Sequence, residues 1–399
     1  MDITIFPTSI SGRVAAIPSK SQAHRLLICA AFADAPTVLL CPQTNRDMEA
    51  TADCLRALGA KIRRSDLGYE VAPIRQLPKT AALPCGESGS TLRFLLPVVG
   101  ALGVDATFEM EARLPQRPLS PLWEEMERMG CTLSRPTPGT LRCQGKLRGG
   151  DYVIDGGVSS QFITGLLFAG VLTKEDCRIL VRGTLESAPY VTMTQKVLAL
   201  FGVDTENFNI PGKQVLRSPG QVTVEGDWSN GAFFLAAKAL GSDLEVTNLD
   251  PRSPQGDRAV THWLPRLKEA YCTIDATDIP DLVPILAVVA GACHGAVFTG
   301  IRRLRLKETD RVATVCAMLN ALGAGAAATE DRLTVRPGVY HGCTIDATAD
   351  HRIAMSAAIA ATVATGPVTV INAHSVEKSY PSFWAEYRRL GGNYEQHIR

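Results

Sequence analysis

The sequence lacks a surplus of charge of either sign. Its 399 residues include 41 Lys and Arg against 40 Asp and Glu, which gives a formal net charge of +1 at pH 7. No overall field therefore draws the chain to nucleic acid or to a lipid surface. We expect neither a nucleic-acid nor a membrane partner, and any affinity for anions has to come from local clusters of basic residues.

Closely spaced cysteines are also missing, although the chain has 11 of them. The nearest ones, such as Cys131 and Cys143, lie 12 positions apart, which excludes CxxC redox pairs and cysteine-rich zinc sites. Single cysteines in apolar surroundings, for example Cys29 and Cys316, are typical of buried free thiols in a reducing compartment. The N-terminus lacks the layout of a signal peptide, so we expect a cytoplasmic protein.

No apolar run is long enough to indicate a membrane helix. The longest, residues 282–298, is interrupted by Pro284, His294 and several glycines and falls short of the roughly 20 apolar residues that a span needs. The composition, 46% hydrophobic and 20% charged, is typical of globular proteins. Because one core stops growing at about 250–300 residues, the length predicts about two domains.

Two kinds of helix alternate along the chain. Amphipathic segments that end in an apolar residue and a turn are expected at 54–60, 126–131, 197–203, 266–272, 318–324 and 387–393. Five of them have glycine just past the end, where a left-handed cap favours it. Tyr271 replaces the glycine in the fourth, and only 52 residues separate Tyr271 from Gly323, against about 70 elsewhere.

Helices of the second kind are apolar nearly all round and should be buried. They are expected at 19–33, 87–102, 159–172, 227–240, 279–292 and 350–364. Short β-type runs, such as 37–40 and 178–183, lie between the helices. The alternation predicts an α/β fold of six strand–helix–strand–helix–strand units, three in each domain.

The N-terminal ends of the buried helices carry polar residues. Such an end presents unpaired N–H groups and a positive dipole, so it can bind an anion, but Ser and Asp are also ordinary caps. Capping is the simpler reading for Asp227 and Ser229. It does not explain Lys20, Arg25 or Arg352, because a cation there is unfavourable unless a ligand or carboxylate is present too.

Residues 302–311 form a basic segment, RRLRLKETDR. Glu308 and Asp310 interrupt it and no aromatic residues interleave, which is not typical of nucleic-acid binding. We expect a helix to begin near Glu308, with Lys307 and Arg311 on one face, where two cations again call for an anion. The same argument applies to Arg113, Arg117 and Lys378.

Ten motifs occur together in the order and spacing of one enzyme family. They are PSKSQAHR (18–25), CGESGSTLR (85–93), LPQRP (114–118), VSSQF (158–162), SAPY (187–190), VEGDWSNGAFFLAA (224–237), IPD (279–281), LKETDR (306–311), DHRIAM (350–355) and EKSYP (377–381). Over essentially its whole length the sequence resembles the 5-enolpyruvylshikimate-3-phosphate (EPSP) synthases. The resemblance implies a two-lobed inside-out α/β barrel of six βαβαββ repeats, three per lobe, with the buried helices directed inward. The implied lobes are residues 18–225, and 1–17 plus 226–399.

The resemblance implies transfer of the enolpyruvyl group of phosphoenolpyruvate to the 5-hydroxyl of shikimate 3-phosphate. Phosphate is released by addition and then elimination, in a monomer without a metal or organic cofactor. The family is the target of glyphosate, but Glu87 stands where many relatives have Asn, so the sensitivity of this chain stays open. Arg303 is a second departure, at a position where some relatives have an Asn that touches the shikimate ring.

The resemblance also assigns residues to the two substrates. Shikimate 3-phosphate would contact Lys20, Ser21, Arg25, Ser159, Ser160, Gln161, Ser187, Tyr190, Asp281 and Lys307. Phosphoenolpyruvate would contact Lys20, Gly89, Arg117, Gln161, Arg311, Arg352 and Lys378. In catalysis Asp281 would take the 5-hydroxyl proton, Glu308 and Lys20 would serve the methylene carbon and the leaving phosphate, and His351 would hydrogen-bond to Glu308 or the reacting carbons. The seven basic residues less Asp281 and Glu308 carry +5, against about −5 to −6 on the substrates.

Two other functions compete with this interpretation. The sister enzyme, UDP-N-acetylglucosamine enolpyruvyl transferase, typically has a Lys–Asn pair and a reactive Cys, whereas this chain has Lys20–Ser21 and no Cys in 113–118. A nucleic-acid-binding repeat protein could use residues 302–311. It would bind polyanions with a steep salt dependence, and it explains neither Asp281 nor the 159–161 motif.

Overall fold

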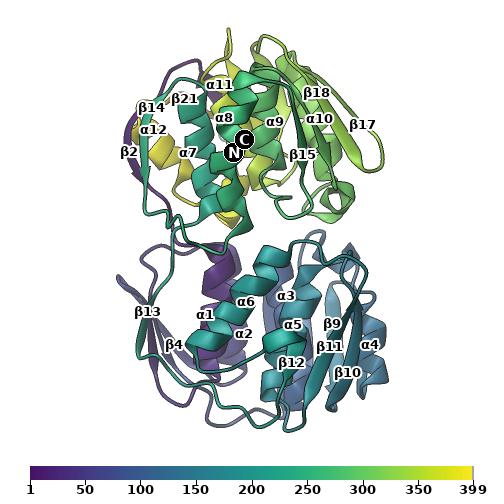
Figure 1. Cartoon of the computed structure of the whole chain (residues 1–399). Coiled ribbons are helices and arrows are strands. Elements are labelled where there is room, and N and C mark those ends of the chain that lie inside the picture. The colour runs from purple at the N-terminus through teal and green to yellow at the C-terminus, as the bar shows by residue number, and fades with distance from the viewer. Residues whose placement is uncertain (398–399) are drawn as a thin grey trace. The chain divides into compact units, whose positions relative to one another are not determined.

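The computed structural model describes residues 1–397, and the chain divides into two compact units. We call Pro18–Val224 the N unit, and Met1–Ile17 together with the chain from Glu225 onward the C unit (Figure 1). The chain therefore passes between the units twice, after Ile17 and after Val224. Helices and strands alternate in both units, which confirms the predicted α/β class.

The N unit contains both predicted kinds of helix. Its elements are α1 (Lys20–Ala31), β3 (Thr37–Leu40), α2 (Arg46–Ala57), β4 (Lys61–Ser65), β5 (Gly68–Ala72), β6 (Thr80–Gly86), α3 (Gly89–Leu102), β7 (Asp105–Met110), η1 (Leu114–Gln116), α4 (Leu122–Arg128), β8 (Cys131–Ser134), β9 (Thr140–Gly145), β10 (Gly150–Asp155), α5 (Ser160–Leu172), β11 (Cys177–Arg182), α6 (Ala188–Leu200), η2 (Glu206–Phe208), β12 (Asn209–Ile210) and β13 (Gln221–Thr223).

The C unit begins with the first two strands of the chain. Its elements are β1 (Asp2–Phe6), β2 (Ser11–Ala15), α7 (Trp228–Ala239), β14 (Asp243–Thr247), η3 (Gly256–Ala259), α8 (Val260–Glu269), β15 (Cys272–Asp275), α9 (Val283–Ala292), β16 (Ala296–Thr299), η4 (Arg302–Leu306), α10 (Arg311–Leu322), β17 (Gly325–Ala328), β18 (Arg332–Arg336), β19 (Cys343–Asp346), α11 (His351–Ala361), β20 (Val368–Ile371), η5 (Ala373–Lys378), α12 (Phe383–Arg389) and β21 (Asn393–His397).

Small sheets repeat through the described part of both units. Four of them share one order, in which a parallel pair is extended by an antiparallel pair: β13-β3-β5-β4, β6-β7-β9-β8, β15-β16-β18-β17 and β19-β20-β1-β21. In the last three of these sheets a helix follows the first strand along the chain and another follows the second, as the predicted repeat requires. In the first sheet the helix before β3 is α1, because the helix that follows β13 is α7 of the C unit.

Two repeats have fewer strands than the βαβαββ pattern that the resemblance implies. The sheet β10-β11-β12 has three strands and the sheet β14-β2 has two. After α8 ends at Glu269, strand β15 of the next repeat already begins at Cys272, which leaves no length for a hairpin. The missing hairpin explains why Tyr271 stands where glycine was expected and why the next interval is short.

The two strands next to the crossings are exchanged between the units. Strand β2 comes directly before α1 in the sequence, yet it pairs in parallel with β14 of the C unit. Strand β13 comes directly before α7, yet it pairs in parallel with β3 of the N unit. Each strand therefore takes the first-strand position in the unit to which the following helix does not belong.

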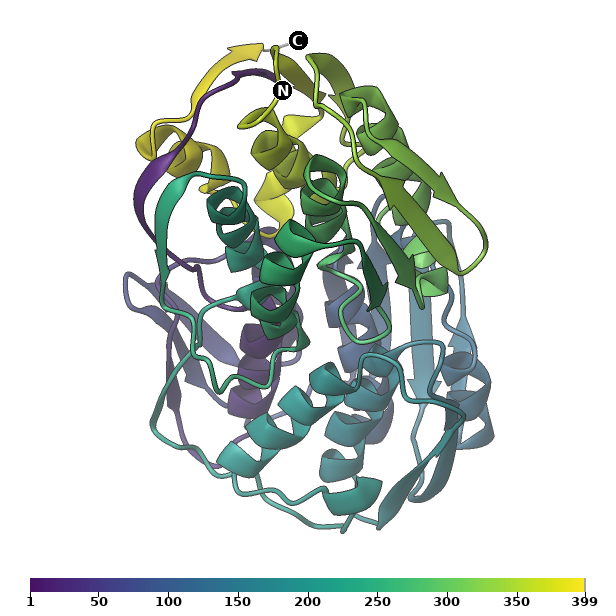
Figure 2. The same cartoon turned by 45° about the horizontal axis from the view of Figure 1, so that its top comes forward.

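Each unit has its own core, formed around the apolar helices. Figures 1 and 2 show α7, α9 and α11 running together through the C unit, with the sheets outside them. In the N unit α3 packs directly on α5. A Cβ at Gly165 would lie 2.3 Å from the carbonyl oxygen of Arg93, so this approach of the two helices requires glycine.

The structure bears on two features of the sequence, the cysteines and the longest apolar run at residues 282–298. All 11 cysteines are free, and seven of them are buried, while Cys316 and three others are only partly buried. In the part of the chain that the structure describes, no helix is both long and apolar enough to cross a membrane.

Candidate functional site

The polar residues at the starts of the buried helices divide into caps and inward-reaching side chains. Ser19, Ser88, Ser159, Asp227 and Asp350 each accept a backbone N–H near the start of their helix. Capping is thus correct for Asp227. It is wrong for Ser229, whose hydroxyl oxygen instead accepts a bond from the guanidinium of Arg352 at 2.7 Å.

Lys20, the first residue of α1, meets a carboxylate. Its ammonium donates to Asp47 Oδ2 at 3.0 Å, and both side chains are mostly buried. Asp47 lies in the first turn of α2, where the helix dipole favours an acid. This pair satisfies the condition that the sequence set for a cation at a helix start.

Arg25 is only 2% exposed and links α1 to α6. Its Nε donates to Thr194 Oγ1 at 2.8 Å and its Nη2 donates to the carbonyl of Tyr190 at 3.0 Å. The guanidinium lies 4.9 Å from the centre of the Phe94 ring, and burial lowers the pKa of Arg25. Within 4 Å no carboxylate of the described residues pairs with it, so a buried positive charge lacks a counter-ion.

The start of α6 is strained close to this arginine. Ser187 is buried and holds φ +55°, a left-handed conformation that is costly for a residue other than glycine. Such backbone strain collects at functional sites. Tyr190, another predicted contact of the first substrate, lies in the first turn of the same helix.

A second group in the N unit surrounds Gly89, the first residue of α3. Arg93 Nη1 donates to Gln161 Oε1 at 2.9 Å, and Gln161 Nε2 donates to Ser90 Oγ at 2.9 Å. A Cβ on Gly89 would lie 2.6 Å from Arg117 Nη1 and 3.0 Å from Arg93 Nη1. Two guanidinium groups therefore converge on a position without a side chain, and the sequence analysis assigned no role to one of them, Arg93.

A buried chain of side-chain hydrogen bonds supports this group from behind. It runs from His24 Nδ1 to Thr51 at 2.6 Å, on to Thr91 at 2.6 Å, and ends at the Ser88 hydroxyl at 2.7 Å. Burial lowers the pKa of His24 to about 3, with the nearby charges of Lys20 acting in the same direction and that of Asp47 opposing it. The chain ties α1 and α2 to the cap of α3.

In the C unit the centre of the cluster is Asp281, just before α9. Arg311 Nη1 donates to its Oδ1 at 2.8 Å and Arg352 Nη2 to its Oδ2 at 3.1 Å, while Lys307 Nζ lies 3.9 Å from Oδ1. Burial by itself raises the pKa of Asp281, but Arg352, Lys307 and Arg311 outweigh it and hold the pKa well below its usual range. The side chain is therefore a carboxylate.

Arg311 organises three acids. It is 1% exposed and donates to Asp350 Oδ2 at 2.9 Å and to Glu308 Oε2 at 2.5 Å, as well as to Asp281. Burial lowers its pKa, but Asp350, Glu308 and Asp281 raise it by more, so the guanidinium stays charged. Asp350 also caps α11.

The helix after the basic segment begins later than predicted. Helix α10 begins at Arg311, and Asp310 caps it by accepting the N–H of Ala313. Lys307 instead ends the η4 turn in an extended conformation, so Lys307 and Arg311 do not share a helix face. The acids of this segment serve as a cap and an ion-pair partner rather than as a helical first turn, yet both cations still reach Asp281.

One further carboxylate belongs to the C-unit cluster and had no place in the sequence analysis. Asp257 in η3 is 3% exposed, and burial together with the charge of Asp281 raises its pKa to about 7, against the opposing effects of Arg352 and Ser229. Nearby, the Gln255 side chain accepts the N–H of Trp228 and donates to the carbonyl of Gly226, which holds this loop to the start of α7. The sequence gives no local signal for this contact, so it could not identify Asp257 as a site residue.

Of the remaining predicted residues, all but Lys378 lie at helix starts within their units. Ser21 is in the first turn of α1 and its carbonyl accepts a bond from Arg25, while Ser159 and Ser160 are the cap and first residue of α5. His351 is buried at the start of α11, and Lys378 is the last residue of η5.

Comparisons with known proteins identify the fold of the chain. Solved EPSP synthase from Acinetobacter baumannii superposes with a TM-score of 0.80 at 23% identity over 99% of both chains. The enolpyruvyl transferase NikO from Streptomyces tendae gives 0.75 at 20% identity, over 100% of this chain and 99% of that one. These likenesses show that the chain has the fold of the enolpyruvyl transferases.

The sequence comparisons narrow the class. A 3-phosphoshikimate 1-carboxyvinyltransferase from Clostridium kluyveri is 36% identical over 99% of this chain and 98% of its own, and one from Clostridium perfringens is 36% identical over 98% of both. The family model for EPSP synthase (3-phosphoshikimate 1-carboxyvinyltransferase) matches residues 6–387. The chain belongs to the EPSP synthase family. This is a family of shikimate-pathway enzymes that transfer the enolpyruvyl group of phosphoenolpyruvate to shikimate 3-phosphate, so the family resemblance and the implied reaction are confirmed.

Proposed function

We propose that this chain carries out the transfer with residues from both units, and that the two units correspond to the lobes 18–225 and 1–17 plus 226–399. Shikimate 3-phosphate binds to Lys20, Ser21, Arg25, Ser159, Ser160, Gln161, Ser187, Tyr190, Asp281 and Lys307. Phosphoenolpyruvate binds to Lys20, Gly89, Arg117, Gln161, Arg311, Arg352 and Lys378. The proposed catalytic residues are Asp281, Glu308, Lys20 and His351.

The observation that carries the proposal is the state of Asp281. A carboxylate held by two guanidinium groups and close to an ammonium is ionised at any pH at which the enzyme works, so it can accept the proton of the 5-hydroxyl. Its low pKa makes it a weak base in the free protein. When Arg311 and Arg352 turn part of their bonding to the anions of phosphoenolpyruvate, that restraint weakens and the basicity of Asp281 rises.

Arg25 supports the assignment of the other substrate. Its buried charge has hydroxyl and carbonyl acceptors but no carboxylate partner among residues 1–397, and a phosphate monoester supplies about −1.5 to −2. Guanidinium groups bind phosphate in bidentate fashion. The serines at the start of α5 add hydroxyl groups, and the α5 N-terminus adds its dipole.

The addition step puts a proton on the methylene carbon, and the elimination step removes a proton from the methyl group so formed while phosphate leaves. Glu308 donates or accepts at that carbon, and Arg311 holds it in place. Lys307, whose pKa burial lowers to about 8 against the raising effect of Asp281, keeps an exchangeable proton near neutral pH beside the 5-hydroxyl. The ammonium group of Lys20 stabilises the negative charge of the departing phosphate.

A phosphate-release assay tests the proposal. The protein is supplied with phosphoenolpyruvate together with either shikimate 3-phosphate or UDP-N-acetylglucosamine, and the phosphate released is measured. Release with the first acceptor only is expected. Release with the second, or with neither, contradicts it, and the product of the first reaction is identified by mass as the enolpyruvyl ether.

We also propose that the enzyme is a cytoplasmic monomer. The 11 free cysteines support a reducing compartment. A mass of 42.8 kDa by light scattering on a size-exclusion column is expected, and a mass of twice that value contradicts the monomer.

A further inference from the structure

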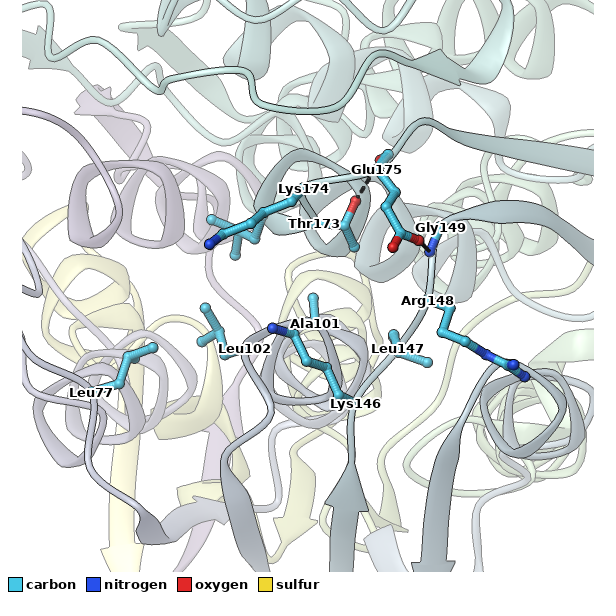
Figure 3. Close-up of a pocket in the computed structure, with 11 residues that line it drawn as sticks. Leu77, Ala101, Leu102, Lys146, Leu147, Arg148, Gly149, Thr173, Lys174 and Glu175 are labelled. Carbon is cyan, nitrogen blue, oxygen red and sulfur yellow. Dashed lines mark hydrogen bonds between the residues drawn. The ribbon is translucent and has the colours of Figure 1, made fainter.

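The N unit contains a pocket at the opposite ends of the helices that carry the site residues. It has a volume of about 400 Å³ and adjoins the C-terminal ends of α3 and α5 (Figure 3). Gly89 and Ser160 stand at the first residues of these helices, which are 14 and 13 residues long. At 1.5 Å per residue the pocket lies about 20 Å from the substrate-binding ends, so it is a separate site.

The lining of the pocket is apolar with a basic rim. Its apolar part consists of Leu77, Ala101, Leu102, Leu147 and Leu172. Its charged part consists of Lys146, Arg148, Lys174 and Glu175. The volume falls within the range of about 300–1,000 Å³ that is common for small-molecule sites.

The acid of the rim is already engaged elsewhere. Glu175 Oε2 accepts the backbone N–H of Gly149 at 2.6 Å, and a Cβ on Gly149 would lie 2.3 Å from the Glu175 Cβ, so this close wall requires glycine. Figure 3 shows the Glu175 carboxylate at the Gly149 side of the pocket, away from the ends of both lysine side chains. It does not neutralise Lys146 or Lys174.

The two lysines share one side of the pocket. Figure 3 shows the side chains of Lys146 and Lys174 extending toward the side where Leu77 and Leu102 lie. Within the described part of the chain, neither of these exposed ammonium groups makes a hydrogen bond or an ion pair. Two like charges over an apolar surface are complementary to one anionic group with an apolar body.

Helix dipoles offer a simpler reason for the lysines, because cations are favourable near helix C-termini. The dipole effect explains why the residues are basic, but it does not explain why a pocket lies between them. In addition, neither ammonium group donates to the last carbonyls of α3 or α5. We propose that this pocket binds a small organic anion, with a carboxylate or phosphate group between Lys146 and Lys174 and an apolar body of about one ring against Leu77 and Leu102. The inference does not depend on the proposed function.

The test uses four probes of stated chemistry and fluorine NMR of the full chain. They are 4-fluorobenzoate, 4-fluorophenyl phosphate, the neutral 4-fluorobenzyl alcohol, and inorganic phosphate as a competitor. We expect 4-fluorobenzoate, 4-fluorophenyl phosphate or both to bind. The one with the lower Kd shows whether the pocket prefers a carboxylate or a phosphate. The alcohol and inorganic phosphate should bind at least about tenfold more weakly, because each lacks half of the recognition. Equal binding of the alcohol, or of inorganic phosphate, overturns the proposal.

Variants locate the binding. In the double variant Lys146→Gln/Lys174→Gln the Kd of the aromatic anion should rise at least about tenfold, since two charge-assisted contacts are lost. Leu77→Asn changes a side chain that is 38% exposed, so it should fold normally and weaken binding several-fold. The matched control Lys61→Gln/Lys196→Gln removes two exposed lysines elsewhere in the N unit and should leave the Kd unchanged.

An unchanged Kd in the first double variant, or an equal loss in the control, overturns the proposal. The melting temperature shows that each variant is folded. The phosphate-release activity of Lys146→Gln/Lys174→Gln should equal that of the parent. If the parent chain itself fails in that assay while the pocket still binds its probe, the proposed function fails and this inference stands.

Discussion

Replacing Asp281 by Asn removes one negative charge and keeps the size of the side chain. Arg311 still has Asp350 at 2.9 Å and Glu308 at 2.5 Å, and Arg352 still has the Ser229 hydroxyl at 2.7 Å. Because no guanidinium loses all its acceptors, the destabilisation should stay below the 3–5 kcal/mol of a fully broken buried pair. We expect about 1–2 kcal/mol and a folded protein.

The effect on catalysis should be much larger. An amide cannot take the hydroxyl proton, and a general base contributes about 10²–10⁴-fold, equivalent to about 3–5 kcal/mol of activation free energy. We therefore expect kcat to fall by that factor in the phosphate-release assay. A matched control is Asp310→Asn, which makes the same chemical change in the cap of α10 and keeps the capping ability.

The pH dependence of stability checks the electrostatic reasoning. Since the folded-state pKa of Asp281 is depressed, its contribution is present above the unfolded value of about 4 and is lost as the pH falls below that value. The difference in melting temperature between the parent and Asp281→Asn should therefore be present at pH 7 and shrink below about pH 4. A kcat equal to that of the parent would refute the role of Asp281, and a difference that does not depend on pH would refute its ionised state.

Three further substitutions have expected outcomes. Gly89→Ala should raise the KM for phosphoenolpyruvate about tenfold with little change in melting temperature, because the added Cβ lies 2.6 Å from the end of the flexible Arg117 side chain; an unchanged KM contradicts this. Lys307→Met should abolish turnover and stabilise the fold below pH 8, because the folded-state pKa of about 8 lies below the ordinary 10.5 and the penalty disappears as the pH rises between these values; a gain that is as large at pH 10.5 as at pH 7 speaks against it. The parent should lose stability as the pH falls from about 6.5 to 3, the interval between the unfolded and folded pKa of His24. In His24→Asn this loss should be smaller. If the melting temperatures of both proteins fall in parallel with pH, the buried imidazole is not neutral.

The sequence predicted the helices better than the sheets. An apolar pattern of the helical period predicts a buried helix wherever it occurs, so the segments 87–102 and 159–172 correspond closely to α3 and α5. Strand pairing is set by partners far away in the chain. Nothing in the local sequence of 11–15 indicates that β2 pairs with β14, more than 200 residues later.

The site was predicted through its cations and less completely through its acids. A cation at a helix start is unusual and therefore visible in the sequence, whereas Asp47 and Asp350 occur at positions where an acid is ordinary. Their roles depend on tertiary contacts with Lys20 and Arg311. Including these two carboxylates lowers the charge of the residues assigned to the substrates from the +5 counted from the sequence to +3.

The position of β1 in its sheet has a consequence for synthesis on the ribosome. This strand lies between β20 and β21, so it is synthesised long before either of the two strands with which it pairs. The N unit, by contrast, is formed by one continuous segment of the chain that ends at Val224. All of its strands are therefore available for pairing once Val224 has left the exit tunnel. Nascent chains should therefore fold in two stages, and a molecular chaperone that engages the translating polypeptide is most useful during the second, while β1 is still unpaired.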